Sequence, residues 1–301
     1  MKKTFLLGII LMCAIQIFGI EIISSGKKII ISSEKLEKYE QVSLETHLIK
    51  DGKPKDDKWL GVDLVTILEE NNITDYDQIK FYSNDNYMVR LKKEEIYSHK
   101  PIIALNRNGE KIDKTHIRLV VPDMRDMFWI SGIAYLETES SFELQFPHNI
   151  IFAEKYLADK EQHNLKPFKD ATGFNFAELT NEILPTDKQY FVIGRDGVSH
   201  WFEYNNYLSK AVLISKGDKF DMKSIQMPGG MWIDDIAAII VGSKAIIFQN
   251  QFNNLEEVME LLKISEYPNT IQLRTRSEKK NIPVNLPFSE NDWQNSLKII
   301  W

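Results

Sequence analysis

The chain has 301 residues, of which 43% are hydrophobic and 27% are charged, and its formal net charge is −6. This composition is typical of a globular protein with enough apolar residues to form packed cores. The mild acidic balance, without a basic patch interleaved with aromatic residues, argues against nucleic acid as a partner.

The first 19 residues predict a secretory signal peptide. Two lysines precede an apolar run over residues 5–18, and cleavage is expected after Gly19. A transmembrane anchor is the alternative, but the run is shorter than the roughly 20 residues that a spanning helix needs. The segment before Cys13 also resembles a lipoprotein processing site, although Met12 is large for the position before the cysteine. We therefore expect a bacterial protein that is periplasmic or secreted, with no membrane span after cleavage.

Cys13 is the only cysteine of the chain and lies inside this predicted leader. The mature protein would then have no disulfide, no thiolate nucleophile and no cysteine metal ligand.

After the leader, residues 20–49 predict several short strands, and Asp51–Lys58 reads as a polar loop. Asp63 is the expected N-cap of a helix whose apolar face includes Leu64 and Ile67. Strands, turns and helical turns follow. A strand, a turn and a second strand are expected over 78–91, and further strands at 101–105, 117–122 and Trp129–Glu137.

A polar, helical-looking stretch at Ala153–Lys166 joins the two halves of the chain. We predict a signal peptide over 1–19, a first domain over 20–150 and a second domain over 151–301. Near the end, Leu255, Val258, Met259 and Leu262 form a helical stripe typical of a packing helix.

An internal repeat supports this division. Phe128-Trp129-Ile130-x-x-Ile133-Ala134 recurs as Met231-Trp232-Ile233-x-x-Ile236-Ala237. The strand, turn and strand of 79–87 also return at 190–198, with Asp85 and Asp196 in equivalent turns. Similar elements in the same order indicate a tandem duplication with a period of roughly 105 residues, which is the size of a small domain. Trp129 and Trp232 are expected to fill the two cores.

The first half resembles the molybdopterin-binding domain of sulfite oxidase-type oxidoreductases. The residues that carry the resemblance are Trp59-x-Gly61-Val62-x-Leu64, Phe81-x-x-x-Asp85-x-Tyr87, Pro101-Ile102-Ile103-Ala104-Leu105, Ile117-Arg118-Leu119-Val120-Val121-Pro122 and Trp129-x-x-x-Ile133. The resemblance implies an α+β fold of mixed sheets with peripheral helices, present here as two tandem domains.

Two departures from that family's pattern bear on catalysis. In the family a cysteine ahead of the Trp-x-Gly-Val element ligates molybdenum, whereas residues 42–58 contain none, and Glu45, Thr46 and His47 are not equivalent donors. A family arginine or lysine just before the signature Trp is also replaced, by Phe128 and Met231. We therefore expect no cofactor, with molybdopterin as the alternative, and neither a metal site nor a catalytic residue is predicted.

Four residues are candidates for binding a cofactor or anion: Asp85, Arg90, Arg107 and Arg118. Asp85 either caps its own turn or faces the cleft where the family binds its pterin. Arg118, which matches a strand arginine of the family, either binds a phosphate-like anion or makes a structural salt bridge. The six histidines are scattered, and no catalytic constellation is recognisable.

We therefore expect a non-catalytic binding or interaction module, with a protein partner or a small anionic or pterin ligand. The alternatives are a molybdopterin-dependent oxidoreductase or its cofactor-binding subunit, and a structural scaffold of an envelope complex.

Overall fold

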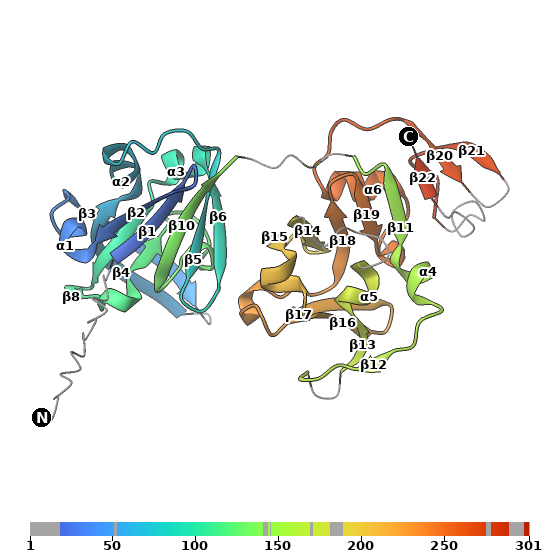
Figure 1. The fold of residues 1–301 in the computed structure, drawn as a ribbon, viewed down its shortest axis with the longest axis horizontal. Coiled ribbons are helices and arrows are strands. Elements are labelled where there is room, and N and C mark those ends of the chain that lie inside the picture. Colours follow the sequence, from blue (N-terminus) through green and yellow to red (C-terminus); the bar gives the residue numbers. More distant parts are fainter. Residues whose placement is uncertain are drawn as a thin grey trace, which may run out of the picture. The chain divides into compact units, whose positions relative to one another are not determined.

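The structure is a computed structural model. It describes residues 19–50, 53–140, 144, 146–168, 171–180, 189–274, 278–288 and 298–300. The predicted leader up to residue 18 lies outside them. The chain divides into two compact units between Ser141 and Phe142, with Asp85–Tyr87 grouped with the second unit. The colour bar of Figure 1 separates the first unit, blue to green, from the second, green to red.

One sheet of the first unit has the strand order β2-β1-β10-β5-β6. Strand β1 runs parallel to β10, and the other neighbours are antiparallel. Every residue of β5 is buried, so this strand lies at the centre of the unit. The bounds are β1 Gly19–Ser24, β2 Lys27–Ser32, β5 Gln78–Ser83, β6 Met88–Lys92 and β10 Ile133–Glu139.

The other sheet of the first unit has the order β3-β4-β7-β8, with β9 also paired to β7. Its bounds are β3 Gln41–Lys50, β4 Lys53–Asp63, β7 Ile102–Arg107, β8 Glu110–Lys111 and β9 Arg118–Val120. The expected loop at Asp51–Lys58 is wrong, because β4 begins at Lys53 and pairs with β3 in unbroken register as far as Val62. The signature strand expected from Trp129 begins only at Ile133.

Short helices connect these strands: α1 Ser33–Leu36, α2 Leu64–Glu70, α3 Lys93–His99 and the 3₁₀ turns η1 Lys114–His116 and η2 Asp126–Phe128. The predicted N-cap at Asp63 is confirmed, since its side chain accepts a hydrogen bond from the backbone N–H of Val65 at 2.8 Å. Leu64, Ile67 and Leu68 are buried, as the apolar face predicted.

The second unit has one sheet of order β11-β19-β18-β14-β15 and another of order β12-β13-β16-β17. A three-stranded sheet, β21-β20-β22, completes it. The strands are β11 Asn149–Phe152, β12 His163–Asn164, β13 Thr172–Asn175, β14 Gln189–Gly194, β15 Ser199–Glu203, β16 Ala211–Lys216, β17 Lys219–Ser224, β18 Ile236–Val241, β19 Lys244–Ile247, β20 Thr270–Arg274, β21 Lys279–Pro283 and β22 Lys298–Ile300.

Helices of the second unit are also short: α4 Ala153–Leu157, α5 Phe176–Thr180, the π-helical turn η3 Tyr204–Leu208, the 3₁₀ turns η4 Gly229–Met231 and η5 Gln249–Gln251, and α6 Leu255–Leu261. The helix expected over Ala153–Lys166 is therefore too long, because α4 ends at Leu157 and β12 follows. The stripe expected to pack is confirmed: Leu255, Val258 and Met259 join a core cluster with residues of β18, β19 and β20.

Each unit contains the same kind of hydrogen bond from a tryptophan to the backbone of its own unit. The indole Nε1 of Trp129 donates to the carbonyl of Val121 at 2.7 Å, and Nε1 of Trp232 donates to the carbonyl of Ser224 at 3.2 Å. Each acceptor lies eight residues before its tryptophan. Both side chains are only partly buried, so the expectation that they fill the cores is wrong, and each packs at the margin of its unit.

A close backbone approach also recurs. A Cβ atom at Gly61 would lie 2.3 Å from the carbonyl oxygen of Ile103, and one at Gly173 would lie 2.0 Å from that of Leu213. Only glycine allows such contact between neighbouring strands. The pairs Gly61–Ala104 and Gly173–Ile214 occupy the same register in β4–β7 and β13–β16.

The edges of the two five-stranded sheets differ. Strands β10, β5 and β6 have the same order and antiparallel pairing as β18, β14 and β15. Beyond β10 lies β1, which is parallel to it, whereas beyond β18 lies β19, which is antiparallel.

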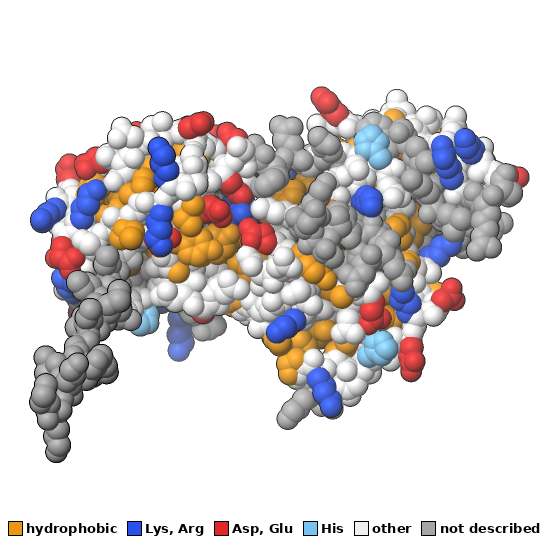
Figure 2. All heavy atoms as spheres, viewed as in Figure 1, with side chains coloured by type: hydrophobic (Ala, Val, Ile, Leu, Met, Phe, Trp, Pro, Cys, Tyr) orange, Lys and Arg blue, Asp and Glu red, His pale blue; other side chains and the backbone are white. Residues whose placement is uncertain are grey.

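None of the helices in the described ranges is long and apolar enough to cross a membrane. Figure 2 shows acidic and basic side chains interspersed over the described surface of the face it presents.

Candidate functional site

Trp59 is the centre of the candidate site in the first unit. It lies on β4, is 1% exposed, and its indole Nε1 donates to Oγ1 of Thr46 at 2.9 Å. The ring of Trp129 meets it edge-on, with 6.1 Å between centroids and 88° between planes. The two indoles form a rigid aromatic corner, held by hydrogen bonds from both Nε1 atoms.

Two guanidinium groups lie over the Trp59 ring. The Cζ atom of Arg107 is 5.0 Å from the ring centroid, and that of Arg118 is 5.7 Å from it. Both distances allow cation–π attraction. Sheet register explains the convergence, because Trp59 pairs with Arg107 across β4 and β7, while Arg118 enters from β9 through its pairing with Ala104.

Arg107 is neutralised by Asp57. Its Nε and Nη2 atoms donate to the two carboxylate oxygens of Asp57 at 2.9 and 2.7 Å, and Asn108 Nδ2 donates to the same group at 2.9 Å. Burial alone would raise the pKa of Asp57, but the hydrogen bonds from Arg107 and Asn108 and the charge of Arg107 outweigh it and lower the pKa. The pair is therefore a fixed, charge-assisted part of the sheet.

Arg118 has no such neutralising partner. Within the residues that the structure describes, its guanidinium takes part in no hydrogen bond or ion pair, and it lies over the Trp59 ring. Burial, followed by the charge of Arg107, lowers its pKa, while Asp57 opposes this effect. A guanidinium remains charged at neutral pH even so. Arg118 therefore has unused hydrogen-bond donors beside an aromatic surface.

A shallow pocket of about 330 Å³ adjoins Arg107. It is lined by Arg107, Asn108, Glu110, Lys111 and Ile112. Lys111 is paired with Glu37 at 2.6 Å, so it contributes little free charge.

The structure brings together two of the four predicted site residues, Arg107 and Arg118. Arg90 and Asp85 belong to β6 and the turn before it, in the other sheet. Nε of Arg90 donates to Oε2 of Glu139 at 2.8 Å, which is a structural ion pair. Asp85 accepts a hydrogen bond from the backbone N–H of Tyr87 at 3.3 Å, and Asp196 accepts the same bond from Val198 at 3.0 Å, as turn-forming aspartates do.

Sequence reasoning missed Asp57, Asn108 and the role of Trp59 as the floor of the site. Trp59 could be read only as part of a motif. Its position opposite Arg107 follows from pairing between strands that lie far apart in the chain.

The segment where the resemblance places a metal-ligating cysteine lies in the β3–β4 hairpin. Glu45 is paired with Lys58 at 2.7 Å, and His47 with Asp56 at 2.8 Å. Thr46 is buried and accepts the bond from Trp59. These donors do not fit molybdenum, which that chemistry holds with a soft thiolate. Over the described ranges, no three His, Cys, Asp or Glu side chains gather as a metal site.

Comparison with known proteins identifies the type of the first domain. Residues 32–143 match the family model described as oxidoreductase molybdopterin binding domain, so the chain contains a domain of this type. A solved structure, the sulfane dehydrogenase SoxCD from Paracoccus pantotrophus, is similar at 11% identity with a TM-score of 0.38. The match covers 94% of this chain and 62% of that one, which is less than two thirds of its length. A search of curated proteins finds no match.

Proposed function

We propose that this chain is an exported, non-catalytic binding module that holds a small planar anion, such as a metal-free pterin, beside Arg118 and Trp129. The observation that carries the proposal is the guanidinium of Arg118, which lies over Trp59 without an ion pair among the described residues. A domain of the molybdopterin-binding type in residues 32–143 supports a pterin as the class of ligand.

The chemistry of the site suits such a ligand. The partly buried ring of Trp129 offers contact for a flat ring, and Arg118 offers a fork of donors for a carboxylate or phosphate. Arg107 adds positive potential but keeps its bidentate bonds to Asp57. Binding sites commonly combine an apolar floor with a few placed polar groups in this way.

Metal catalysis is not part of the proposal, because the donor set does not fit. Residues 42–58 carry no thiol, and Glu45, Thr46 and His47 are bonded to residues of β4. A pterin bound here would therefore be held through its ring and its acidic group.

The second candidate is a cofactor-binding subunit of a molybdopterin-dependent oxidoreductase. The family match at 32–143 favours it, since that family takes its description from this cofactor. This candidate requires molybdenum to be bound without protein thiolate ligation.

We also propose that the second unit is a divergent copy of the first. The matching indole hydrogen bonds of Trp129 and Trp232, and the matching glycine contacts of Gly61 and Gly173, support this. Asp221, on β17, occupies the position beside β16 that Arg118, on β9, occupies beside β7. The charge at this position is therefore reversed in the second unit. The two units would then bind different ligands.

The test is a titration of the purified full chain with pterin-6-carboxylate, followed by tryptophan fluorescence. Binding should weaken about tenfold or more in Arg118→Gln, because a charge-assisted hydrogen bond contributes about 1.5–3 kcal/mol. The matched control is Arg195→Gln, an exposed arginine of the second unit, which should bind as the unaltered chain does. Equal binding by Arg118→Gln would contradict the proposal.

Elemental analysis of protein from its native host separates the two candidates. We expect no stoichiometric molybdenum and no sulfite oxidation. Stoichiometric molybdenum with turnover would favour the oxidoreductase subunit instead.

A further inference from the structure

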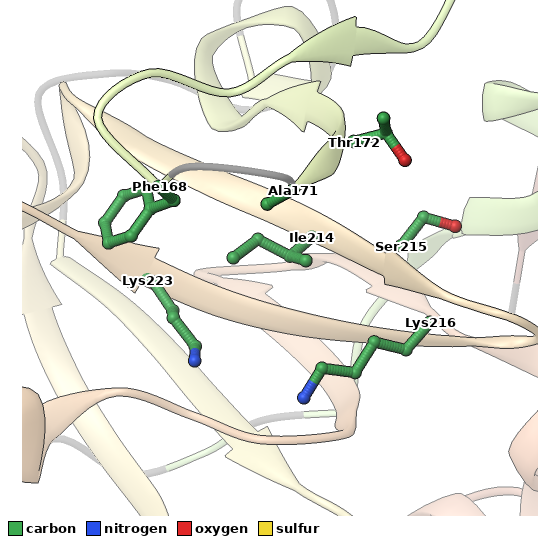
Figure 3. A pocket seen from close by; sticks show the side chains of 7 residues that line it. All are labelled: Phe168, Ala171, Thr172, Ile214, Ser215, Lys216 and Lys223. Carbon is green, nitrogen blue, oxygen red and sulfur yellow. The ribbon is translucent and has the colours of Figure 1, made fainter.

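The second unit has a pocket of its own, of about 420 Å³, on the β16–β17 hairpin. Figure 3 shows the side chains that line it, with Ile214 between Phe168 and the hydroxyl-bearing residues. The lining is Phe168, Ala171, Thr172, Ile214, Ser215, Lys216 and Lys223. All these residues belong to the second unit, so the pocket does not involve the Trp59 site.

One wall of the pocket is aromatic and apolar. The rings of Phe168 and Trp232 meet edge to face, with 5.7 Å between centroids and 82° between planes. Phe168 and Ala171 also pack against a small core cluster that includes Ile214. A flat hydrocarbon ring is the kind of group that packs best against this wall.

Of the three lysines on the β16–β17 hairpin, two are paired with carboxylates. Lys216 is paired with the buried carboxylate of Asp221, and Lys219 with Asp235 at 2.7 Å. Lys223 lies on the face of the hairpin that carries Ile214, because it pairs in register with Val212, which is two residues before Ile214 on the same strand. Its Nζ lies 4.7 Å from the centroid of the Trp232 ring, and it has no anionic partner among the described residues.

The balance of charges favours a singly charged ligand. The hydrogen bond and charge of Asp221, against the effect of burial and with a smaller contribution from the charge of Asp234, raise the pKa of Lys216, so two carboxylates already act on this lysine. A dianion would bring its second charge towards these carboxylates, where like charges repel. A monoanion can pair with Lys223 alone.

We infer that this pocket binds a small aromatic carboxylate, with its ring against Phe168 and Ile214 and its carboxylate on Lys223. The inference goes beyond the proposed function, because it concerns a different unit, a different cation and a monoanionic ligand. Thr172 and Ser215 supply hydroxyls at the far end of the pocket, where a polar ring substituent can be recognised.

Benzoate is the probe, titrated into the full chain by isothermal titration calorimetry. We expect saturable binding at or below about 10 mM, the range that the ligand efficiency of so small a molecule allows. Lys223→Gln should weaken binding about tenfold or more, and Lys223→Arg should restore most of it. Lys210→Gln, which removes an exposed lysine just before β16, should leave binding unchanged. Phenyl phosphate, a dianion, should bind more weakly than benzoate.

A second variant tests the pocket without changing its charge. Ala171→Trp fills the space beside Phe168 and should abolish benzoate binding while Lys223 remains. The thermal midpoint of each variant confirms that it is folded. Absence of saturation, or equal benzoate binding by folded Lys223→Gln, would overturn the inference. Loss of benzoate binding in Arg118→Gln would overturn it too, since the ligand would then occupy the first unit. If pterin-6-carboxylate did not bind while benzoate still did, only the proposed function would be contradicted.

Discussion

Thr46 Oγ1 lies 2.9 Å from Nε1 of Trp59 and accepts its hydrogen bond inside the first unit. Thr46 is 6% exposed and Trp59 is 1% exposed, so the bond is shielded from water. The hydroxyl of Thr46 thus holds the Trp59 ring in place beneath the candidate site. Thr46 lies in the segment in which the family resemblance places a metal-ligating cysteine. The residue there has a structural role.

Removing that acceptor should destabilise the first unit. Thr46→Val keeps the shape of the side chain but leaves the indole N–H of Trp59 buried and unsatisfied, which costs about 1–3 kcal/mol. The measurement is urea unfolding followed by tryptophan fluorescence. Thr46→Ser retains a hydroxyl and serves as the control, which should lose less stability than Thr46→Val. Equal stability of Thr46→Val and the unaltered chain would contradict the role assigned to this bond.

Truncating Trp129 tests the margin of the site. Trp129→Ala removes contact with Trp59 and the bond to Val121, and should destabilise the unit by about 3 kcal/mol, the low end for a large aromatic residue because the ring is only partly buried. Trp129→Phe keeps most of the contact area and loses only the indole N–H, so a smaller loss is expected. Differential scanning calorimetry measures both. A neutral Trp129→Ala combined with lost pterin binding would show that the ring serves the ligand rather than the fold.

Local patterns predicted the local features well. The cap at Asp63, the buried face of α2 and the turns at Asp85 and Asp196 each depend on a few adjacent residues. Short-range hydrogen bonding and periodicity determine such features, and both can be read in a single sequence.

The first half of β4 could not be predicted, because its residues 53–58 are charged or proline and show no apolar alternation. Cross-strand ion pairs support it instead: Lys58 with Glu45, Asp56 with His47, and Asp57 with Arg107. The partners lie between 9 and 50 residues away. Long-range strand pairing also places Arg107 and Arg118 over one ring. The sequence therefore predicted both arginines as site residues, but it did not predict that they lie over the same side chain.

A buried ion network in the first unit gives a further prediction. Lys80, 3% exposed, is paired with Glu139 at 2.7 Å, and Glu139 also accepts from Arg90. Glu139→Gln leaves a buried lysine short of negative charge, and should destabilise the unit by about 3–5 kcal/mol, as for a broken buried ion pair.

Glu137 is the matched control for this change. It lies 3.7 Å from the same Lys80 Nζ but its side chain is 36% exposed, so Glu137→Gln should change stability by less than about 1 kcal/mol. Chemical denaturation of the two variants at pH 7 makes the comparison. Similar losses of stability in the two variants would show that Glu137 and Glu139 stabilise Lys80 equally, in spite of their different distances from it.

Asp57 should make the first unit sensitive to acid. Arg107 and Asn108 lower its pKa in the folded state, against the effect of burial, so the folded protein binds this proton less readily than the unfolded chain. The resulting stability is fully present above the ordinary aspartate pKa of about 3.9, and is lost as the pH falls towards the lowered folded value. Asp57→Asn removes this titration, and its difference in unfolding free energy from the unaltered chain should therefore shrink between pH 6 and pH 3. Asp75→Asn, at an exposed aspartate of the same unit, is the control for removing a surface carboxylate and should cost little stability at pH 6. Urea denaturation at fixed pH values measures both. A difference for Asp57→Asn that stayed constant down to pH 3 would mean that the folded pKa of Asp57 is not lowered, and Arg107 would then be more available to an anion than its bidentate bonds imply.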